Sequence, residues 1–155
     1  MKIEKQLLLI GVGNPLRGDD GVAHKLCNFI AGNDSAFELM QVQQLQPELT
    51  DTFLGRKLVI IADASPNAAH SQLVLLEREE LKTNSSFSHQ LDASLLVKLF
   101  YTLHPTEEVQ FKLLHLPGFS FEMGERLSLE CEAHLLDGVL LIIQERNAMI
   151  STNSH

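Results

Sequence analysis

Acidic side chains stand at two places in the sequence where a carboxylate could do chemistry. Asp19 and Asp20 form an adjacent pair in a loop, and Asp63 directly follows the five apolar residues 58–62. A carboxylate beside buried apolar segments is costly unless hydrogen bonds, a cation or protonation relieve it. One aspartate is enough to cap the helix after the loop, so we assign Asp19 to that cap and expect Asp20 and Asp63 to be functional. The ordinary alternative for Asp63 is a helix cap or a loop hydrogen bond.

His89 is the histidine with the most suggestive surroundings. It lies in the stretch 88–91 (SHQL), after a polar segment and just ahead of a predicted helix. Taken alone, a histidine in such a place is a surface or capping residue. The other six histidines lack even this context, and we expect them to be structural or solvated: His24, His70, His104, His115, His134 and His155.

The loop with the acidic pair begins like a nucleotide-binding loop but carries the wrong charge. Residues 11–16 (GVGNPL) start a dinucleotide-binding fingerprint whose third glycine would have to be Leu16. The loop glycines also have the spacing of a P-loop, but Asp19 and Asp20 occupy the places of its lysine and Ser/Thr. Because two negative charges repel a phosphate, nucleotide binding is disfavoured.

Short apolar runs alternate with helical patterns along the chain, and these elements must position the acidic residues. Strands are predicted at 7–12, 37–42, 57–62, 73–76 and 109–116, and helices at 21–30, from Pro47, at 91–100 and at 129–144. Ligand sites in such folds lie beyond the carboxyl ends of the strands. Since the first and third strands are normally neighbours, we expect Asp20 and Asp63 to share one crevice.

These elements predict an α/β fold, a single-domain three-layer sandwich. Its sheet is expected to be mostly parallel and twisted, with about five strands and with helices on both faces. The domain is expected to span residues 1–146. The polar residues 147–155 are expected to form a disordered tail.

Composition excludes several classes of partner and indicates a reducing compartment. The formal net charge is −8, and no cluster of lysine and arginine could attract a nucleic acid. Cys27 and Cys131 lie far apart in apolar helical patterns, as expected of reduced, buried thiols. The apolar stretch near the start is too short for a signal peptide or a membrane span. We therefore expect a cytoplasmic protein with no nucleic-acid or membrane partner.

Three stretches together resemble the hydrogenase maturation protease family, whose members process the C-terminus of the nickel–iron hydrogenase large subunit. They are residues 11–21 (GVGNPLRGDDG), 60–64 (IIADA) and 88–91 (SHQL), and the likeness extends loosely from Leu7 to about Gln144. The first stretch is fairly specific. The other two are persuasive because they follow in the family's order and spacing. The resemblance implies a twisted sheet flanked by helices, which agrees with the fold predicted above.

The resemblance also implies a metal site. Family members bind a divalent metal with two acidic residues and one histidine, which by motif are Asp20, Asp63 and His89. Two carboxylates and an imidazole leave coordination positions open and suit a first-row metal such as nickel. The implied nickel is not a resident cofactor but the ion already loaded into the precursor, so only a filled precursor is cut. Cleavage then removes a C-terminal extension, and a monomer suffices for this contact.

Two aspects of the implied reaction stay open. The metal can polarise the carbonyl or activate a water, or it can only position the substrate while Asp20 or Asp63 acts as general base. Many members carry an Asp-Gly-Gly-Thr turn after the second strand, where this chain has residues 42–49 (VQQLQPEL), similar to one branch of the family. Gln44, Pro47 and Glu48 are therefore the expected substrate-recognition residues, and the hydrogenase that is processed stays open.

Two other functions fit part of the pattern. A phosphoacceptor receiver domain also has an acidic pair and an aspartate at the end of its third strand. However, the pair here stands seven residues beyond the first strand, and no lysine follows the last one. The other alternative is a non-catalytic module that holds nickel for a partner, which would bind metal without shortening a precursor.

Overall fold

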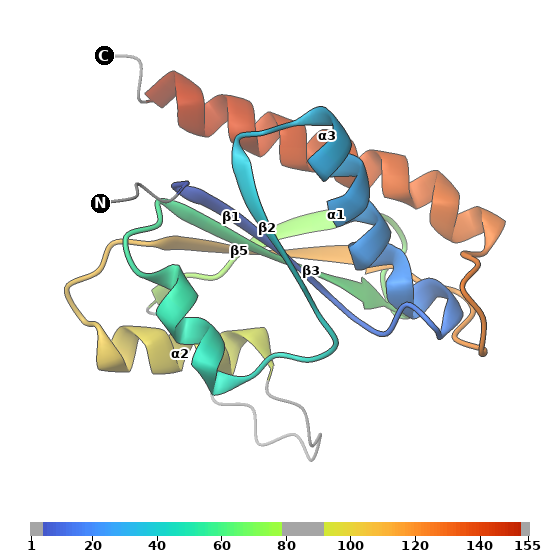
Figure 1. The fold of residues 1–155 in the computed structure, drawn as a ribbon, viewed down its shortest axis with the longest axis horizontal. Helices are drawn as coiled ribbons and strands as arrows, with labels where there is room; N and C mark the ends of the chain where they lie inside the picture. The colour runs from blue at the N-terminus through green and yellow to red at the C-terminus, as the bar shows by residue number, and fades with distance from the viewer. Residues whose placement is uncertain (1–4, 79–91, 153–155) are drawn as a thin grey trace.

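Five strands and three α-helices carry most of the residues that the computed structural model describes, which are 5–78 and 92–152 (Figure 1). In chain order the elements are β1 (Leu7–Val12), the 3-10 helix η1 (Gly18–Gly21), α1 (Val22–Asn33), β2 (Phe37–Val42), the 3-10 helix η2 (Pro47–Phe53), β3 (Leu58–Ser65), β4 (Gln72–Leu75), α2 (Ala93–Leu103), β5 (Gln110–Pro117) and α3 (Leu129–Thr152). Within the described ranges, no helix has both the length and the apolar character needed to cross a membrane.

The strands form one sheet in the order β2-β1-β3-β5-β4. Four of them run parallel, whereas β4 pairs antiparallel with β5. As the sequence predicted, β1 and β3 are neighbours, with Val12 opposite Asp63 in their register. Because carboxyl ends of parallel strands meet at one edge, the loop after β1 and the end of β3 lie together there.

Helices cover both faces of this sheet, so the predicted three-layer sandwich is confirmed (Figure 1). Successive strand residues point to opposite faces. Leu9 and Ile60 pack with α1 and α3 in one core cluster, and Ile10 and Ile61 pack with α2 and η2 in the other. Strands buried on both faces explain why the sequence shows continuous apolar runs there.

Strand β3 is longer than the sequence predicted. The apolar run ends before Asp63, but the strand continues through Ser65 because its ladder with β5 extends to the pair Ser65–Pro117. The Gly118 N–H then donates to the Ser65 carbonyl at 3.1 Å. Asp63 is therefore held inside a paired strand rather than in a loop.

Helix α3 continues to Thr152, so the prediction of a disordered tail is wrong for residues 147–152. Two contacts after the predicted end explain this. Met149 packs against the core cluster shared with α1, and Arg146 lies 3.1 Å from the carboxylate of Asp34 at the end of α1. Residues 153–155 lie outside the described ranges.

Candidate functional site

Asp20 is positioned by a tight backbone turn after β1. Gly13 has a φ of 144°, and a Cβ atom there would come within 1.9 Å of the Asp20 carbonyl oxygen. Only glycine allows this conformation and this approach. The Asn14 N–H donates to the Asp20 carboxylate at 2.7 Å, which fixes the half-buried side chain beside the end of β1.

Asp63 is positioned by the sheet and faces the layer of α2 and η2. Val59 and Ile61 point to that face, so the alternation along β3 carries the Asp63 side chain to it as well. Burial and the negative charge of Asp20 raise the pKa of Asp63 to about 7, against a hydrogen bond from the Ala64 backbone. The two carboxylates thus interact electrostatically at the edge of the sheet. They come together as the sequence predicted.

Asp19 does not cap α1, contrary to the assignment made from the sequence. Its side chain is wholly buried, and its carboxylate accepts four hydrogen bonds of 2.7 to 3.0 Å. The donors are the N–H groups of Phe119, Ser120 and Ser128 and the Ser128 hydroxyl. Helix α1 begins without a side-chain cap. The donors lie about a hundred residues away in sequence, so no local pattern could reveal them.

The hydrogen bonds to Asp19 fasten the loop before α1 to the segment between β5 and α3. Burial alone would raise the pKa of Asp19, but the bonds from Ser128, Phe119 and Ser120 outweigh it, and the pKa is lowered. The Ser128 hydroxyl also accepts a bond from the Cys131 N–H in the first turn of α3. Asp19 therefore stays ionised, and its wholly buried carboxylate has a structural role.

The third predicted ligand, His89, lies outside the described residues. Within the described part of the chain, no three His, Cys, Asp or Glu side chains gather closely enough to hold a metal ion. The ligand roles of Asp20, Asp63 and His89 therefore stay predictions. The segment that contains His89 leads into α2, which covers the face to which Asp63 points.

His115 is a residue near the site that the sequence did not single out. It lies on β5 directly opposite Asp63 in the β3–β5 register, so the two side chains project from the same face of the sheet. Burial lowers the pKa of His115, which favours the neutral form of its ring. Its place beside Asp63 depends on strand order and register, and a single sequence shows neither.

Two of the three predicted recognition residues line a pocket at this edge. Gln44 and Glu48 belong to the wall of a cavity of about 570 Å³ between β2 and η2. Pro47 is not part of the wall but opens η2, where its fixed φ suits the first turn of a helix. The Gly13 N–H donates to the carbonyl of Val42, which also lines the pocket. The pocket and the carboxylate pair therefore share the turn at Gly13.

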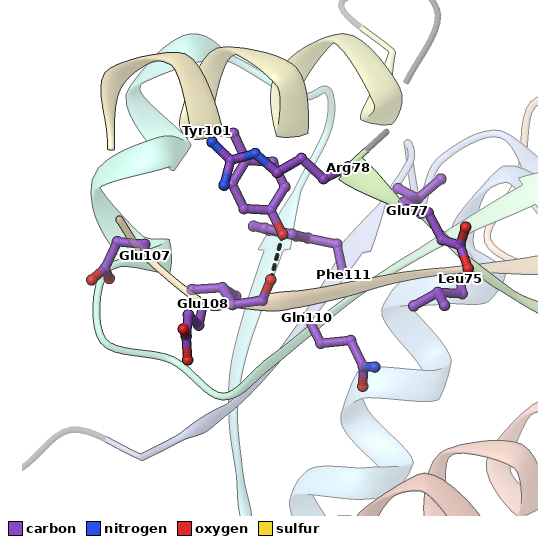
Figure 2. A pocket seen from close by; sticks show the side chains of 10 residues that line it. Leu75, Glu77, Arg78, Tyr101, Glu107, Glu108, Gln110 and Phe111 are labelled. Atoms are coloured by element: carbon purple, nitrogen blue, oxygen red, sulfur yellow. Dashed lines mark hydrogen bonds between the residues drawn. The ribbon is translucent and has the colours of Figure 1, made fainter. Parts of the chain in front are cut away.

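Another pocket, of about 440 Å³, lies at the opposite edge of the sheet, where β5 begins (Figure 2). The guanidinium of Arg78 lies over the ring of Tyr101 at 4.7 Å, and the Tyr101 hydroxyl donates to the Val109 carbonyl. Arg78 also donates to the Pro105 carbonyl at 3.1 Å. These groups satisfy one another at the amino end of β5, away from the carboxylate pair.

The cysteines do not offer a nucleophile. Cys27 and Cys131 are free and wholly buried, as the sequence predicted. Burial raises the pKa of each thiol to about 12, so neither forms a thiolate near neutral pH. The chemistry available at the carboxyl edge is therefore that of Asp20 and Asp63, which can ligate a divalent cation or accept a proton.

No protein-family model matches the sequence, and no curated protein matches it. Solved structures do match. HybD of Thermococcus kodakarensis, a NiFe hydrogenase maturation protease, has a TM-score of 0.68 at 20% identity, covering 90% of this chain and 97% of its own. The hydrogenase maturating endopeptidase HybD of E. coli has a TM-score of 0.72 at 17% identity, covering 93% of each chain. A hydrogenase 2 maturation peptidase from a Thaumarchaeota archaeon has a TM-score of 0.67 at 21% identity, covering 91% and 97%. The chain therefore has the fold seen in these hydrogenase maturation proteases.

Proposed function

We propose that this protein is an endopeptidase that removes the C-terminal extension of a nickel-loaded hydrogenase large-subunit precursor. The observation that carries the proposal is the convergence of Asp20 and Asp63 at the carboxyl edge of the sheet, where burial and the charge of Asp20 raise the pKa of Asp63. Structures with this fold are named as proteases or endopeptidases that mature hydrogenases. That likeness supports the choice of substrate.

Nickel in this proposal belongs to the substrate. Asp20 and Asp63 supply carboxylate oxygens and His89 supplies an imidazole nitrogen, a donor set that suits nickel and leaves positions for the precursor's own ligands. The mutual repulsion of the two carboxylates favours this role, because a divalent cation relieves it. A nickel-free precursor offers no cation to the carboxylates and is therefore not bound. Processing is thus restricted to filled precursors.

The acid–base work falls to the same carboxylates. A pKa of about 7 gives Asp63 comparable protonated and ionised fractions at neutral pH, which suits a group that takes a proton from water and returns it to the leaving amine. In this aspartyl-type scheme the nickel positions the scissile bond, and it can also polarise the carbonyl. Asp20, held by the Asn14 N–H, serves chiefly as a ligand.

Selection of the precursor is assigned to the pocket between β2 and η2. Gln44 and Glu48 present an amide and a carboxylate on its wall, and Pro47 holds the start of η2. Because this pocket shares the turn at Gly13 with the carboxylate pair, a chain bound there can reach the site. The proposed partner is the precursor, met in the cytoplasm, and the charge of −8 disfavours nucleic acid.

The receiver alternative loses its physical basis at Asp19. A receiver uses both members of its acidic pair around a magnesium ion, whereas here the oxygens of Asp19 are occupied by four hydrogen bonds from residues 119–128. A non-catalytic nickel module remains the alternative to be separated by experiment. It differs from a protease only in the fate of the precursor.

The decisive experiment incubates the protein with nickel-loaded and with nickel-free precursor and measures the intact mass of each. We expect shortening of the loaded form alone. Asp63→Asn and His89→Ala are expected to fold normally and to cleave at least about 100-fold more slowly. Asp137→Asn and His70→Ala, at exposed positions, serve as matched controls and should keep full activity. Nickel-dependent binding without any shortening would favour the holding module instead.

A further inference from the structure

Asp63 belongs to a row of side chains that crosses the carboxyl edge of the sheet. In the strand register, Val12 of β1 lies on one side of Asp63, and His115 of β5 lies on the other. The row continues to Gln72 of β4, which pairs with His115. Paired residues of neighbouring strands are about 4.8 Å apart, and their side chains point to the same face. A substrate that binds at Asp63 therefore has Val12 or His115 beside it.

The two flanks of Asp63 differ in what they offer a substrate. Val12 is apolar and 7% exposed, so its side chain provides no hydrogen-bond donor. His115 is half-buried, and its ring takes part in no hydrogen bond within residues 5–78 and 92–152. The preceding residues on that face of β5, Phe111 and Leu113, pack in the core cluster beneath α2. The imidazole thus follows directly after the end of the core, with its nitrogens available to a ligand.

The proposed reaction fixes where the carbonyl group of the scissile bond must lie. A water molecule that gives a proton to Asp63 lies about 2.6–3.2 Å from the carboxylate. The carbonyl carbon that this water attacks lies about 3–3.5 Å from the water oxygen. The carbonyl group is therefore about 5–6 Å from the carboxylate, close to one strand spacing. Because His115 extends from the next strand toward the same face, its ring is within reach of the carbonyl oxygen.

We propose that the ring of His115 donates a hydrogen bond to the carbonyl oxygen of the peptide bond that is cleaved. The inference rests on the proposed protease function and adds a catalytic residue to it. His115 is the donor among the two side chains that flank Asp63 in the sheet. An imidazole carries an N–H in its neutral and in its charged form, so this role does not depend on its titration.

The hydrogen bond matters most when charge develops on the carbonyl oxygen. Asp63 takes a proton from the water, the water oxygen bonds to the carbonyl carbon, and the π electron pair moves onto the carbonyl oxygen. The N–H of His115 stabilises this negative oxygen and keeps its proton. When the electron pair returns, the C–N bond breaks and Asp63 gives its proton to the amine nitrogen. The products are a carboxylic acid and an amine, and both side chains are restored.

The test follows single-turnover shortening of the nickel-loaded precursor by intact mass, over a range of protein concentrations. His115→Leu removes the donor, and we expect the maximal rate to fall about 100-fold, as for the loss of one donor to an oxyanion. The half-saturating concentration should change by less than about twofold, because the bond is strong only in the transition state. His115→Gln keeps an N–H donor and should regain at least about tenfold of the lost rate.

Gln110→Ala is the matched control. Gln110 is an exposed polar residue at the other end of the same strand, and its variant should cleave at the wild-type rate. Calorimetry with Ni²⁺ should give the same affinity for wild type and His115→Leu. A loss of affinity of about tenfold or more would make His115 a nickel ligand and would overturn the proposal. Lower stability to urea without any rescue by His115→Gln would show a merely structural role and would also overturn it.

Failure of this inference is distinguishable from failure of the proposed function. If wild type and His115→Leu shorten the loaded precursor at the same maximal rate, the inference is wrong and the protease function stands. If the wild-type protein does not shorten the loaded precursor at all, the proposed function is wrong and the inference falls with it. A slow His115→Leu variant with normal half-saturation and rescue by His115→Gln supports both.

Discussion

Asp19 and Asp63 are the same residue type at the same edge of the sheet, yet their surroundings act on them in opposite directions. The Asp19 side chain, on η1, is wholly buried, and four hydrogen bonds converge on its carboxylate and lower its pKa. Asp63 is half-buried at the end of β3, receives a hydrogen bond from the Ala64 backbone and faces the charge of Asp20, which leaves its pKa near 7. Donors that saturate a carboxylate make it structural. A shortage of donors leaves it reactive.

The difference arises from the kind of backbone around each residue. The segment between β5 and α3 has N–H groups without partners in a strand or helix, and Asp19 collects three of them. Asp63 lies within β3, where the ladder with neighbouring strands uses the backbone groups. Its carboxylate therefore depends on a proton or a cation to offset the cost of burial.

The largest expected effect on stability comes from Asp19→Asn. The amide fits the same space, but its NH₂ group must face backbone N–H donors, which then lack an acceptor. Leaving such donors unsatisfied is expected to lower the free energy of unfolding by about 3 kcal/mol at pH 7, measured by urea denaturation. Because the lowered pKa of Asp19 stabilises the fold only while the group is ionised, the deficit should shrink as the pH falls below about 4.

Asp92 supplies the matched control for that experiment. Its carboxylate caps α2 by accepting one hydrogen bond, from the Leu95 N–H at 2.8 Å. Asp92→Ala should cost about 1 kcal/mol, the ordinary value of a helix cap. If Asp19→Asn lowers the unfolding free energy by no more than Asp92→Ala does, the four hydrogen bonds to Asp19 are worth no more than one helix cap. The contrast drawn between Asp19 and Asp63 would then be wrong for Asp19.

A smaller effect on stability is expected from Gly13→Ala, which disturbs the backbone turn that positions Asp20 near Asp63. The new Cβ would meet the Asp20 carbonyl at 1.9 Å in a backbone of φ 144°, so Asp20 must move. We expect a loss of about 2 kcal/mol in unfolding free energy. Gly124→Ala separates the effect of a steric clash from the effect of backbone strain. Gly124 has a similar φ of 142°, but a Cβ atom there would have no neighbouring atom within 4 Å. Nickel affinity, measured by calorimetry, should fall for Gly13→Ala and stay unchanged for Gly124→Ala.

The sequence predicted the parts of this edge that follow from strand order. Short apolar runs mark the strands, and neighbouring parallel strands must bring the loop with Asp20 beside Asp63. The pocket beside Gln44 and Glu48 lies after β2, where the sequence placed the substrate-recognition residues. These inferences need only local periodicity and the rules of parallel sheets.

The sequence did not predict the parts that depend on long-range contacts. The donors to Asp19 come from residues 119–128, so a local cap seemed sufficient to explain it. His115 becomes a neighbour of Asp63 only through the β3–β5 register. On α3, the apolar spacing predicts Leu136 and Leu140 on the inner face of the helix, but they are 60% and 58% exposed, because periodicity alone does not tell which apolar side meets the sheet.

The smallest effect, and the one of opposite sign, is expected from Asp63→Asn. The pKa of Asp63 rises from 3.8 to about 7 on folding, so ionisation of this group opposes folding, and the cost grows between these two pH values and is complete above pH 7. Removing the charge should therefore raise the unfolding free energy by about 1–2 kcal/mol at pH 8, after allowance for partial exposure, and by almost nothing at pH 4. Urea denaturation of wild type and variant across this range, without metal, measures the difference. Asp51→Asn, at an exposed position on η2, should give no pH-dependent gain. If the difference in unfolding free energy between Asp63→Asn and wild type does not change with pH, the carboxylate of Asp63 is as fully hydrogen-bonded as that of Asp19. This edge of the sheet would then lack a carboxylate that needs a cation.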